Sequence, residues 1–273
     1  MKNRYVLLVG LLLTSMINAQ IVPVPDVNFK AKLIAEQPLA YDANGQNIKI
    51  DLNSNGEIEI AEALRVAVLT IHFSEISNLS GIEYFTNLTS LTCYGNKLTQ
   101  LDVTALSKLK YLSCFDNKLT VLHVNGMPNL EELLCHANAL NAIDLTGLPK
   151  LKKIDCENNL LAYLNLSSLL SLEYINCQKN KLSSIDASGL SVLRNLYCAS
   201  NLLTSIKVSG LINLTDFDFS NNLLTGFDAS GLKSLKNFYC YKNQLTTLNV
   251  SGLSALSEFH CNDNFLTSLD INA

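Results

Sequence analysis

Eight cysteines are the most conspicuous residues able to do chemistry in this 273-residue chain. Thiols can form disulfides or ligate metals, and an even number in a secreted protein ordinarily indicates a disulfide framework. The spacing here argues otherwise, because the cysteines recur every 21 residues apart from one gap, which Phe219 divides evenly. They are Cys93, Cys114, Cys135, Cys156, Cys177, Cys198, Cys240 and Cys261. The pattern predicts one thiol per structural repeat.

A disulfide framework does not fit this spacing. Thiols on neighbouring in-register strands would have Cβ atoms about 4.8 Å apart, beyond the usual disulfide range of about 3.5–4.5 Å. We therefore expect buried free thiols that pack as small apolar groups. A metal-binding thiol column is the alternative, although no paired C-x-x-C supports it. The larger Phe219 should overpack its slot unless its neighbours shift, and it predicts an aromatic cluster with Phe217, Phe227, Phe238 and Phe259.

Oxygen-bearing side chains are concentrated in the segment 51–62, DLNSNGEIEIAE. Its carboxylates and amides recur at the spacing of a calcium loop, with a glycine for the sharp turn and a backbone carbonyl at Glu57. The predicted metal ligands are Asp51, Asn53, Asn55, Glu57 and Glu62. The segment resembles the loop of EF-hand and dockerin-like modules, which implies a structural calcium ion. The alternative is an Asn-Gly turn that leads into a capped helix.

Repetition extends over most of the chain. From Leu88, nine copies follow the pattern L-x-x-L-x-C-x-x-N-x-L-x-x-L-x-V-S-G-L-x-x without insertion. This resembles the short, 21-residue bacterial class of leucine-rich repeats, which implies a β-solenoid wound as a right-handed parallel coil. A 22-residue opening repeat, 66–87, contains ISNLSGIEYFTNLTSL and is similar to the first repeats of internalin-type surface proteins.

The remaining segments suggest a domain organisation. Residues 1–19 resemble a signal peptide, with a basic start, a short apolar run and a small residue at position 19. Residues 20–65 form an N-terminal cap, and 66–273 the repeat domain. Within the cap we expect helices over 27–37 and 60–68. The chain ends inside the ninth repeat with no polar cap, which favours either a longer protein or a partner that covers the last turn.

Two polar columns accompany the repeat. Asparagine occupies the ninth position of all nine copies, where a buried amide can bond the backbone of the adjacent turn. At position fifteen, Asp102, Asp144, Asp186, Asp228 and Asp270 fall on every second copy, which relieves repulsion between stacked charges. A cation-binding ladder is the alternative, but we favour a solvent-facing column.

The residues left for function lie at positions 3, 5 and 7 of each copy, which should face outward from the strands. Aromatic and histidine side chains gather there, namely Tyr94, Tyr111, Phe115, His136, Tyr174, Tyr197, Tyr239, Tyr241 and His260. Acidic residues are interspersed among them. We predict a secreted or cell-surface binding protein that uses this face for protein–protein interaction or adhesion, with carbohydrate binding as the alternative.

Other classes of function find little support in the sequence. The four histidines occupy no metalloprotease or triad-like context, so we expect no enzyme. The net charge is −4 and no basic stripe is present, which argues against nucleic acid. We also expect no transmembrane segment, because the apolar run in 1–19 is too short to span a bilayer.

Overall fold

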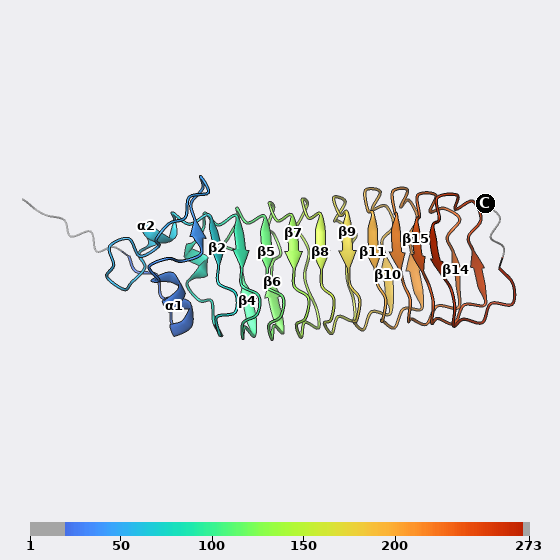
Figure 1. Ribbon diagram of the computed structural model, residues 1–273, viewed down its shortest axis with the longest axis horizontal. Helices are drawn as coiled ribbons and strands as arrows, with labels where there is room; N and C mark the ends of the chain where they lie inside the picture. The colour runs from blue at the N-terminus through green and yellow to red at the C-terminus, as the bar shows by residue number, and fades with distance from the viewer. Residues whose placement is uncertain (1–19, 270–273) are drawn as a thin grey trace, which may run out of the picture.

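The repeats build a long rod with a small cap at its N-terminal end (Figure 1). The computed structural model describes residues 20–269, so the predicted signal peptide and Asp270 lie outside the described residues. No described helix has the length and apolar character needed to cross a membrane. The predicted β-solenoid is confirmed, with one turn of the coil for each 21-residue copy.

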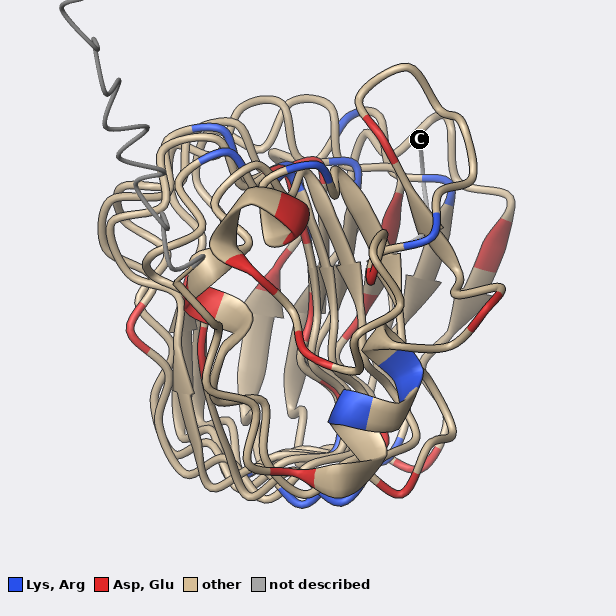
Figure 2. Cartoon of the chain, turned by 90° about the vertical axis from the view of Figure 1, so that its left-hand side faces the viewer, with Lys and Arg blue, Asp and Glu red and all other residues tan. Residues whose placement is uncertain are grey.

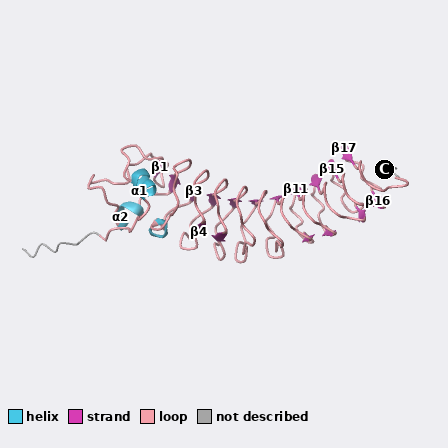
Figure 3. Cartoon of the chain, turned by 90° about the horizontal axis from the view of Figure 1, so that it is seen from below, coloured by secondary structure: helices cyan, strands magenta, loops and turns pink. Residues whose placement is uncertain are grey.

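One wall of the rod is an 11-stranded sheet, which we call the front sheet. All its pairs are parallel and in register except the antiparallel pair of β1 and β2, so equivalent positions of successive repeats form straight columns. Its strands are β1 (Ala40–Tyr41), β2 (Val68–Thr70), β3 (Ser90–Thr92), β5 (Tyr111–Ser113), β7 (Glu132–Leu134), β8 (Lys153–Asp155), β9 (Tyr174–Asn176), β11 (Asn195–Tyr197), β13 (Asp216–Asp218), β15 (Asn237–Tyr239) and β17 (Glu258–His260). The rod is bowed, and the front sheet lies on its inner side (Figure 3).

The opposite side, here called the back wall, contains three separate pairs of parallel strands in the described part of the chain. The pairs are β4 (Gln100–Asp102) with β6 (Val121–His123), β10 (Ser184–Asp186) with β12 (Ser205–Lys207), and β14 (Gly226–Asp228) with β16 (Thr247–Asn249). In these repeats the back wall is therefore built from short strands rather than helices. Between the first two pairs, only an isolated bridge joins His123 to Asp144.

Leucine and cysteine columns fill the space between the two walls. All eight cysteines are free, seven are buried, and Cys261 in the last described turn is half-buried. Desolvation by burial raises the pKa of the Cys93 and Cys177 thiols to about 12. The thiols thus pack in the core as predicted and are protonated at neutral pH.

Phe219 fills its cysteine slot by joining an aromatic cluster. Its ring centroid lies 4.9 Å from that of Phe227 on the back wall and 5.6 Å from that of Phe238 in the front sheet. Phe217 and Phe259 extend the cluster, as the sequence predicts. Phe219 and Phe238 are fully buried, so the slot accommodates the larger ring through aromatic neighbours.

The asparagine column links the turns by hydrogen bonds, as predicted. Asn201 is typical, because its Nδ2 donates to the carbonyls of Cys177 (3.0 Å) and Cys198 (3.1 Å), and its Oδ1 accepts from the Leu182 N–H (3.0 Å). Each such amide serves backbone groups that have no strand partner where the chain leaves the front sheet. The column therefore holds consecutive turns in register.

The cap covers the first turn of the coil. Helix α1 (Val27–Leu33) buries Phe29 and Leu33 as expected, but it ends four residues before the predicted end at Gln37. Gln37 precedes Pro38, and the residue before a proline avoids helical conformation. Glu36, which was expected in the helix, instead accepts a hydrogen bond from Lys49 Nζ at 2.8 Å. Helix α2 (Ile60–Ala63) is also shorter than predicted, because β2 takes Val68 into the front sheet. A 3₁₀ turn, η1 (Ile82–Tyr84), completes the opening repeat.

Candidate functional site

The front sheet presents a continuous outer face along the described part of the rod. Within each strand the middle residue points into the core, so its two neighbours point outward. Eight of the nine predicted partner-binding residues are half-buried and His260 is exposed. Four further residues at outward positions are buried beside larger neighbours, contrary to expectation. They are Ser113, Asn176, Ala199 and Ser220.

Position seven of successive turns forms a stack of rings near the cap. The ring centroids of His72 and Tyr94 are 4.9 Å apart, those of Tyr94 and Phe115 4.2 Å, and those of Phe115 and His136 4.3 Å. Adjacent planes are within 11° of parallel. We call these four residues the aromatic stack. His72 was not among the predicted residues, although alignment of the opening repeat at Val66 places it at the same position.

The aromatic stack turns ring edges, rather than faces, to the outside. Each inner ring has both faces covered by its neighbours, and Phe73 packs edge-on against Tyr94 with centroids 5.2 Å apart. Phe73 itself is 66% exposed and rests over Gly95, where a Cβ atom would collide with the Phe73 ring. This end of the face therefore offers a rigid apolar edge.

The C-terminal part of the face has looser aromatic contacts. Tyr174 and Tyr197 lie with their rings tilted by 60° and centroids 5.6 Å apart, and Lys153 Nζ is 5.2 Å from the Tyr174 centroid. Tyr239 stacks on His260 at 5.3 Å. Tyr111 and Tyr241 pair with no other ring among the described residues. The front sheet thus brings the predicted residues together in separate groups.

Carboxylates accompany these rings along the face. Positions 3, 5 and 7 of the described turns contain one lysine, Lys153, and six acidic residues, namely Glu132, Asp155, Glu157, Asp216, Asp218 and Glu258. Burial raises the pKa of Asp155 and of Asp218. His136 Nδ1 lies 3.6 Å from Asp155 Oδ2, too long for a hydrogen bond. The face is therefore acidic and keeps some carboxylates at an electrostatic cost.

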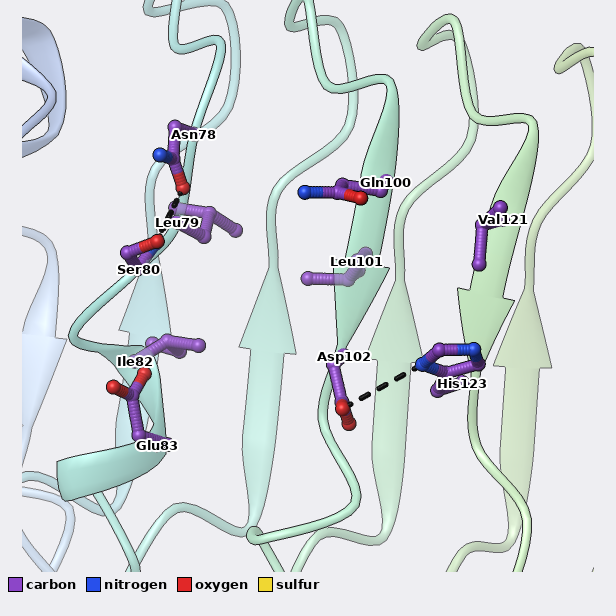
Figure 4. Close-up of a pocket in the computed structure, with 10 residues that line it drawn as sticks. All are labelled: Asn78, Leu79, Ser80, Ile82, Glu83, Gln100, Leu101, Asp102, Val121 and His123. Carbon is purple, nitrogen blue, oxygen red and sulfur yellow. Dashed lines mark hydrogen bonds and ion pairs between the residues drawn. The ribbon is translucent and has the colours of Figure 1, made fainter.

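The back wall carries a second feature, a pocket of about 290 Å³ between the opening repeat and the first two back strands (Figure 4). His123 Nδ1 lies 3.5 Å from Asp102 Oδ2, and both side chains are more than half exposed. Ser80 Oγ donates to Asn78 Oδ1 and lies away from the histidine. The pocket thus lacks the contact between nucleophile and base that covalent catalysis needs.

The position-fifteen column on the back wall is exposed, as predicted for its described members. Asp144 Oδ1 accepts the Thr146 N–H at 3.0 Å, and this bond lowers the pKa of Asp144. Asp186 accepts the Ser188 N–H in the same way and pairs with Lys207 at 3.2 Å. Acidic and basic residues are dispersed around the coil when it is viewed from the cap end (Figure 2). The aspartates of the position-fifteen column therefore stabilise local turns by accepting a backbone N–H two residues ahead.

The predicted calcium loop lies in the cap and leads into α2. Asp51 and Glu62 are buried, Asn53 and Asn55 are exposed, and the Glu57 side chain turns away to pair with Lys30 at 2.7 Å. Across residues 20–269, no three side chains of the His, Cys, Asp or Glu type converge as a ready metal cluster. Binding of an ion here would therefore also need amide and backbone oxygens.

Glu59, which lies between the predicted ligands, is a further buried carboxylate of this loop. Its Oε1 accepts from the amides of Asn53 (3.2 Å) and Asn55 (2.8 Å), while its Oε2 is buried without a described hydrogen-bond partner. Burial, together with the adjoining Glu59 carboxylate, raises the pKa of Glu62. The loop thus holds negative charge in a desolvated position.

Comparison with known proteins agrees with this fold. Residues 65–159 match the family model of the leucine-rich-repeat domain of the endo-β-N-acetylglucosaminidase EndoS. The functional domain of InlJ from Listeria monocytogenes is 30% identical, with a TM-score of 0.69, and the match covers 92% of this chain. Its structure is described as including a cysteine ladder, a feature that the thiol column shares. This chain spans 58% of that domain's length.

Other solved structures share the architecture. Leptospira interrogans LIC12759, a leucine-rich-repeat protein, is 23% identical with a TM-score of 0.66, and the match covers 89% of this chain and 76% of that one. Listeria monocytogenes InlP is 25% identical with a TM-score of 0.56, covering 71% and 61%. No curated protein sequence matches significantly. The chain thus has the leucine-rich-repeat solenoid fold and is similar to bacterial proteins of that kind.

Proposed function

We propose that this chain is a secreted or cell-surface binding protein whose front sheet binds a protein ligand, as in adhesion. The observation that carries the proposal is the row of half-exposed rings and carboxylates on the inner side of the bowed rod. Large aromatic side chains contribute much of the energy of protein interfaces. The similarity to internalins supports the location at the surface or outside the cell, and the fold is typically a binding scaffold rather than an enzyme.

The charge of the front sheet narrows the class of ligand. The three outward columns contain six carboxylates and one lysine, so this side of the rod is complementary in charge to a basic protein surface. Protein partners also fit the wider fold, since LRIM1 was solved in complex with APL1C. The ring edges of the aromatic stack would contact apolar side chains between the basic groups.

Carbohydrate binding is the second candidate, and one observation favours it. The family model that matches residues 65–159 comes from an enzyme named for its action on N-acetylglucosamine linkages. A sugar needs an open ring face for stacking, which the inner rings of the aromatic stack do not offer. Tyr197 and Tyr239 in the C-terminal groups are the residues that would serve a glycan.

Screening the purified chain on an array of extracellular proteins and on a glycan array tests both candidates. We expect protein hits whose affinity falls at least about tenfold in a Tyr94→Ser, Phe115→Ser double variant, because buried aromatic contacts dominate such interfaces. Tyr163→Ser is the matched control, since Tyr163 lies in the column of the back strands and is 66% exposed.

Two results would contradict the protein-binding proposal. Protein hits that survive the double variant unchanged would place the interface elsewhere. Glycan hits that are lost in a Tyr197→Ala, Tyr239→Ala variant, without protein hits, would establish the carbohydrate alternative instead.

A further inference from the structure

The cap loop contains three buried carboxylates without a neutralising cation among the described residues. Asp51 is 3% exposed, Glu59 7% and Glu62 6%. The one ion pair that the loop makes in the described structure joins Lys30 to the half-exposed Glu57. Buried carboxylates in proteins are ordinarily paired with a cation or coordinate a metal. The described structure therefore places no positive charge against these three carboxylates.

Backbone N–H groups satisfy two of these carboxylates. Asp51 accepts from the N–H groups of Asn55 (3.2 Å) and Gly56 (3.0 Å), so the segment curls around it. Glu62 accepts from the N–H groups of Leu52 (2.7 Å) and Glu59 (3.1 Å), which ties the end of the loop to its beginning. These bonds bring the two ends of the segment together and position both carboxylates in its interior.

Glu59 is the carboxylate that this arrangement leaves unsatisfied. Its side chain is directed at the loop, because Oε1 contacts the amides of Asn53 and Asn55. Its Oε2 is buried and accepts no hydrogen bond in the described structure. An unpaired buried carboxylate oxygen is costly. A cation bound inside the loop would remove this cost.

We propose that the segment 51–62 binds one calcium ion, which compensates the buried charge of Asp51, Glu59 and Glu62. The available donors are carboxylate, amide and carbonyl oxygens, the set that hard cations prefer. Calcium fits better than magnesium because it accepts more ligands in a less regular geometry. Asn53, Asn55 and the Glu57 carbonyl supply the oxygens that the carboxylates alone do not.

The ion would also strengthen the attachment of the cap to the coil. Glu57 pairs with Lys30 on α1, so the loop is joined directly to that helix. At the start of α1, Asp26 Oδ2 accepts from the N–H groups of Ser77 (2.9 Å) and Asn78 (3.0 Å) in the opening repeat. Ordering of the loop by calcium therefore stabilises α1 and its contact with the first turn.

Thermal unfolding of the full chain after treatment with a chelator tests this site. Addition of CaCl2 to 10 mM should raise Tm by about 3–10 °C, with half of the effect at about 0.1–1 mM. MgCl2 at the same concentration should have less than half of that effect. Hydrogen exchange should slow in α1 and in 51–62, while the repeats after Leu130 stay unchanged.

Two variants assign the effect to the loop. Glu62→Gln should abolish the calcium-dependent rise in Tm, whereas Glu36→Gln, which removes an exposed cap carboxylate, should keep it. Glu59→Gln, which replaces the carboxylate oxygen that accepts no hydrogen bond in the described structure, should reduce the rise in Tm on calcium addition.

Equal responses to CaCl2 and MgCl2 in the unmodified chain would overturn the proposal. This measurement needs no variant, so it decides the question even if Glu62→Gln fails to fold. A Glu59→Gln protein that keeps the full calcium-dependent rise in Tm would contradict the role of Glu59 in the site.

Discussion

The front sheet and the back wall are built from the same 21-residue repeat, yet they use it differently. On the back wall, position fifteen is mostly Asp or Asn, and each such residue in the described turns accepts the N–H two residues ahead, as Asp186 and Asn165 do. On the front sheet, the outward columns vary from Tyr to Glu to Asn. Local hydrogen bonding thus restricts residue type on the back and leaves it free on the front.

The two walls also differ in continuity. Hydrogen bonds between strands run unbroken through the front sheet, whereas the back wall has three separate strand pairs within residues 20–269. The ladder can hold outward side chains in fixed columns, which is what a binding surface requires. The front sheet is thus both the regular scaffold of the rod and its variable surface.

The largest expected effect comes from replacing Phe219, whose ring lies between the two walls. Phe219 contacts rings from both, so Phe219→Cys, which restores the repeat pattern, should leave a cavity and reduce the free energy of unfolding by about 2–4 kcal/mol. Urea denaturation measures this loss. Phe265→Ala, at a residue that is 66% exposed, is the control and should change stability by less than about 0.5 kcal/mol. A neutral Phe219→Cys would mean that the walls close around the smaller side chain.

The next effect concerns the asparagine column at the end of the front strands. Asn201→Ala leaves the Leu182 N–H without a partner and removes one of the two amide donors to each of the Cys177 and Cys198 carbonyls, so we expect a loss of about 2–3 kcal/mol in the free energy of unfolding. Asn213→Ala removes one exposed bond, to the Ser191 carbonyl, and should cost less than about 1 kcal/mol. Equal losses in the two variants would show that the column does not hold the register.

The smallest expected effect is the change in stability at pH 7 when a single aspartate is neutralised. Its sign should differ between the front sheet and the back wall. Burial raises the pKa of Asp218, so the folded chain holds this proton more tightly than the unfolded chain. Its contribution to stability is greatest below the unfolded pKa, near 4, and is lost as the pH rises through the folded pKa. Asp218→Asn should therefore raise stability at pH 7 by about 0.5–1 kcal/mol, with no difference near pH 3.

Asp186 on the back wall is the matched control for that substitution. The bonds from Ser188 lower its pKa, so its contribution is present above the unfolded pKa and is lost as the pH falls through the folded pKa. Asp186→Asn should lower Tm slightly at pH 7. If both variants changed Tm in the same direction, the electrostatic difference between the walls would be refuted.

Sequence periodicity alone predicts most of the fold. The buried thiols, the asparagine column and the Phe219 cluster follow from position within the repeat, because stacking in register converts a period into a column. Turn conformation is less accessible to prediction. The residue before each column asparagine has a positive φ in every described repeat, even at Ala137 and Lys179. The bonds of the following asparagine impose it against local preference.

The candidate site was predictable only in part. Outward positions identify the nine residues of the front sheet, but the face-to-face stacking that includes His72 depends on ring orientation between turns. The early end of α1 and the orphaned Glu59 oxygen likewise arise from tertiary contacts. Composition and spacing carry no information on such contacts, because they are set by the packing of distant segments.

The thiol column has a practical consequence for following local opening of the rod. A buried thiol with a pKa of about 12, as at Cys93 and Cys177, resists alkylation and oxidation until its own turn exposes it. Since the cysteines mark nearly every turn from Cys93 to Cys261, they divide the coil into separately addressable segments. The protein therefore contains its own set of position markers, from which fraying could be mapped turn by turn.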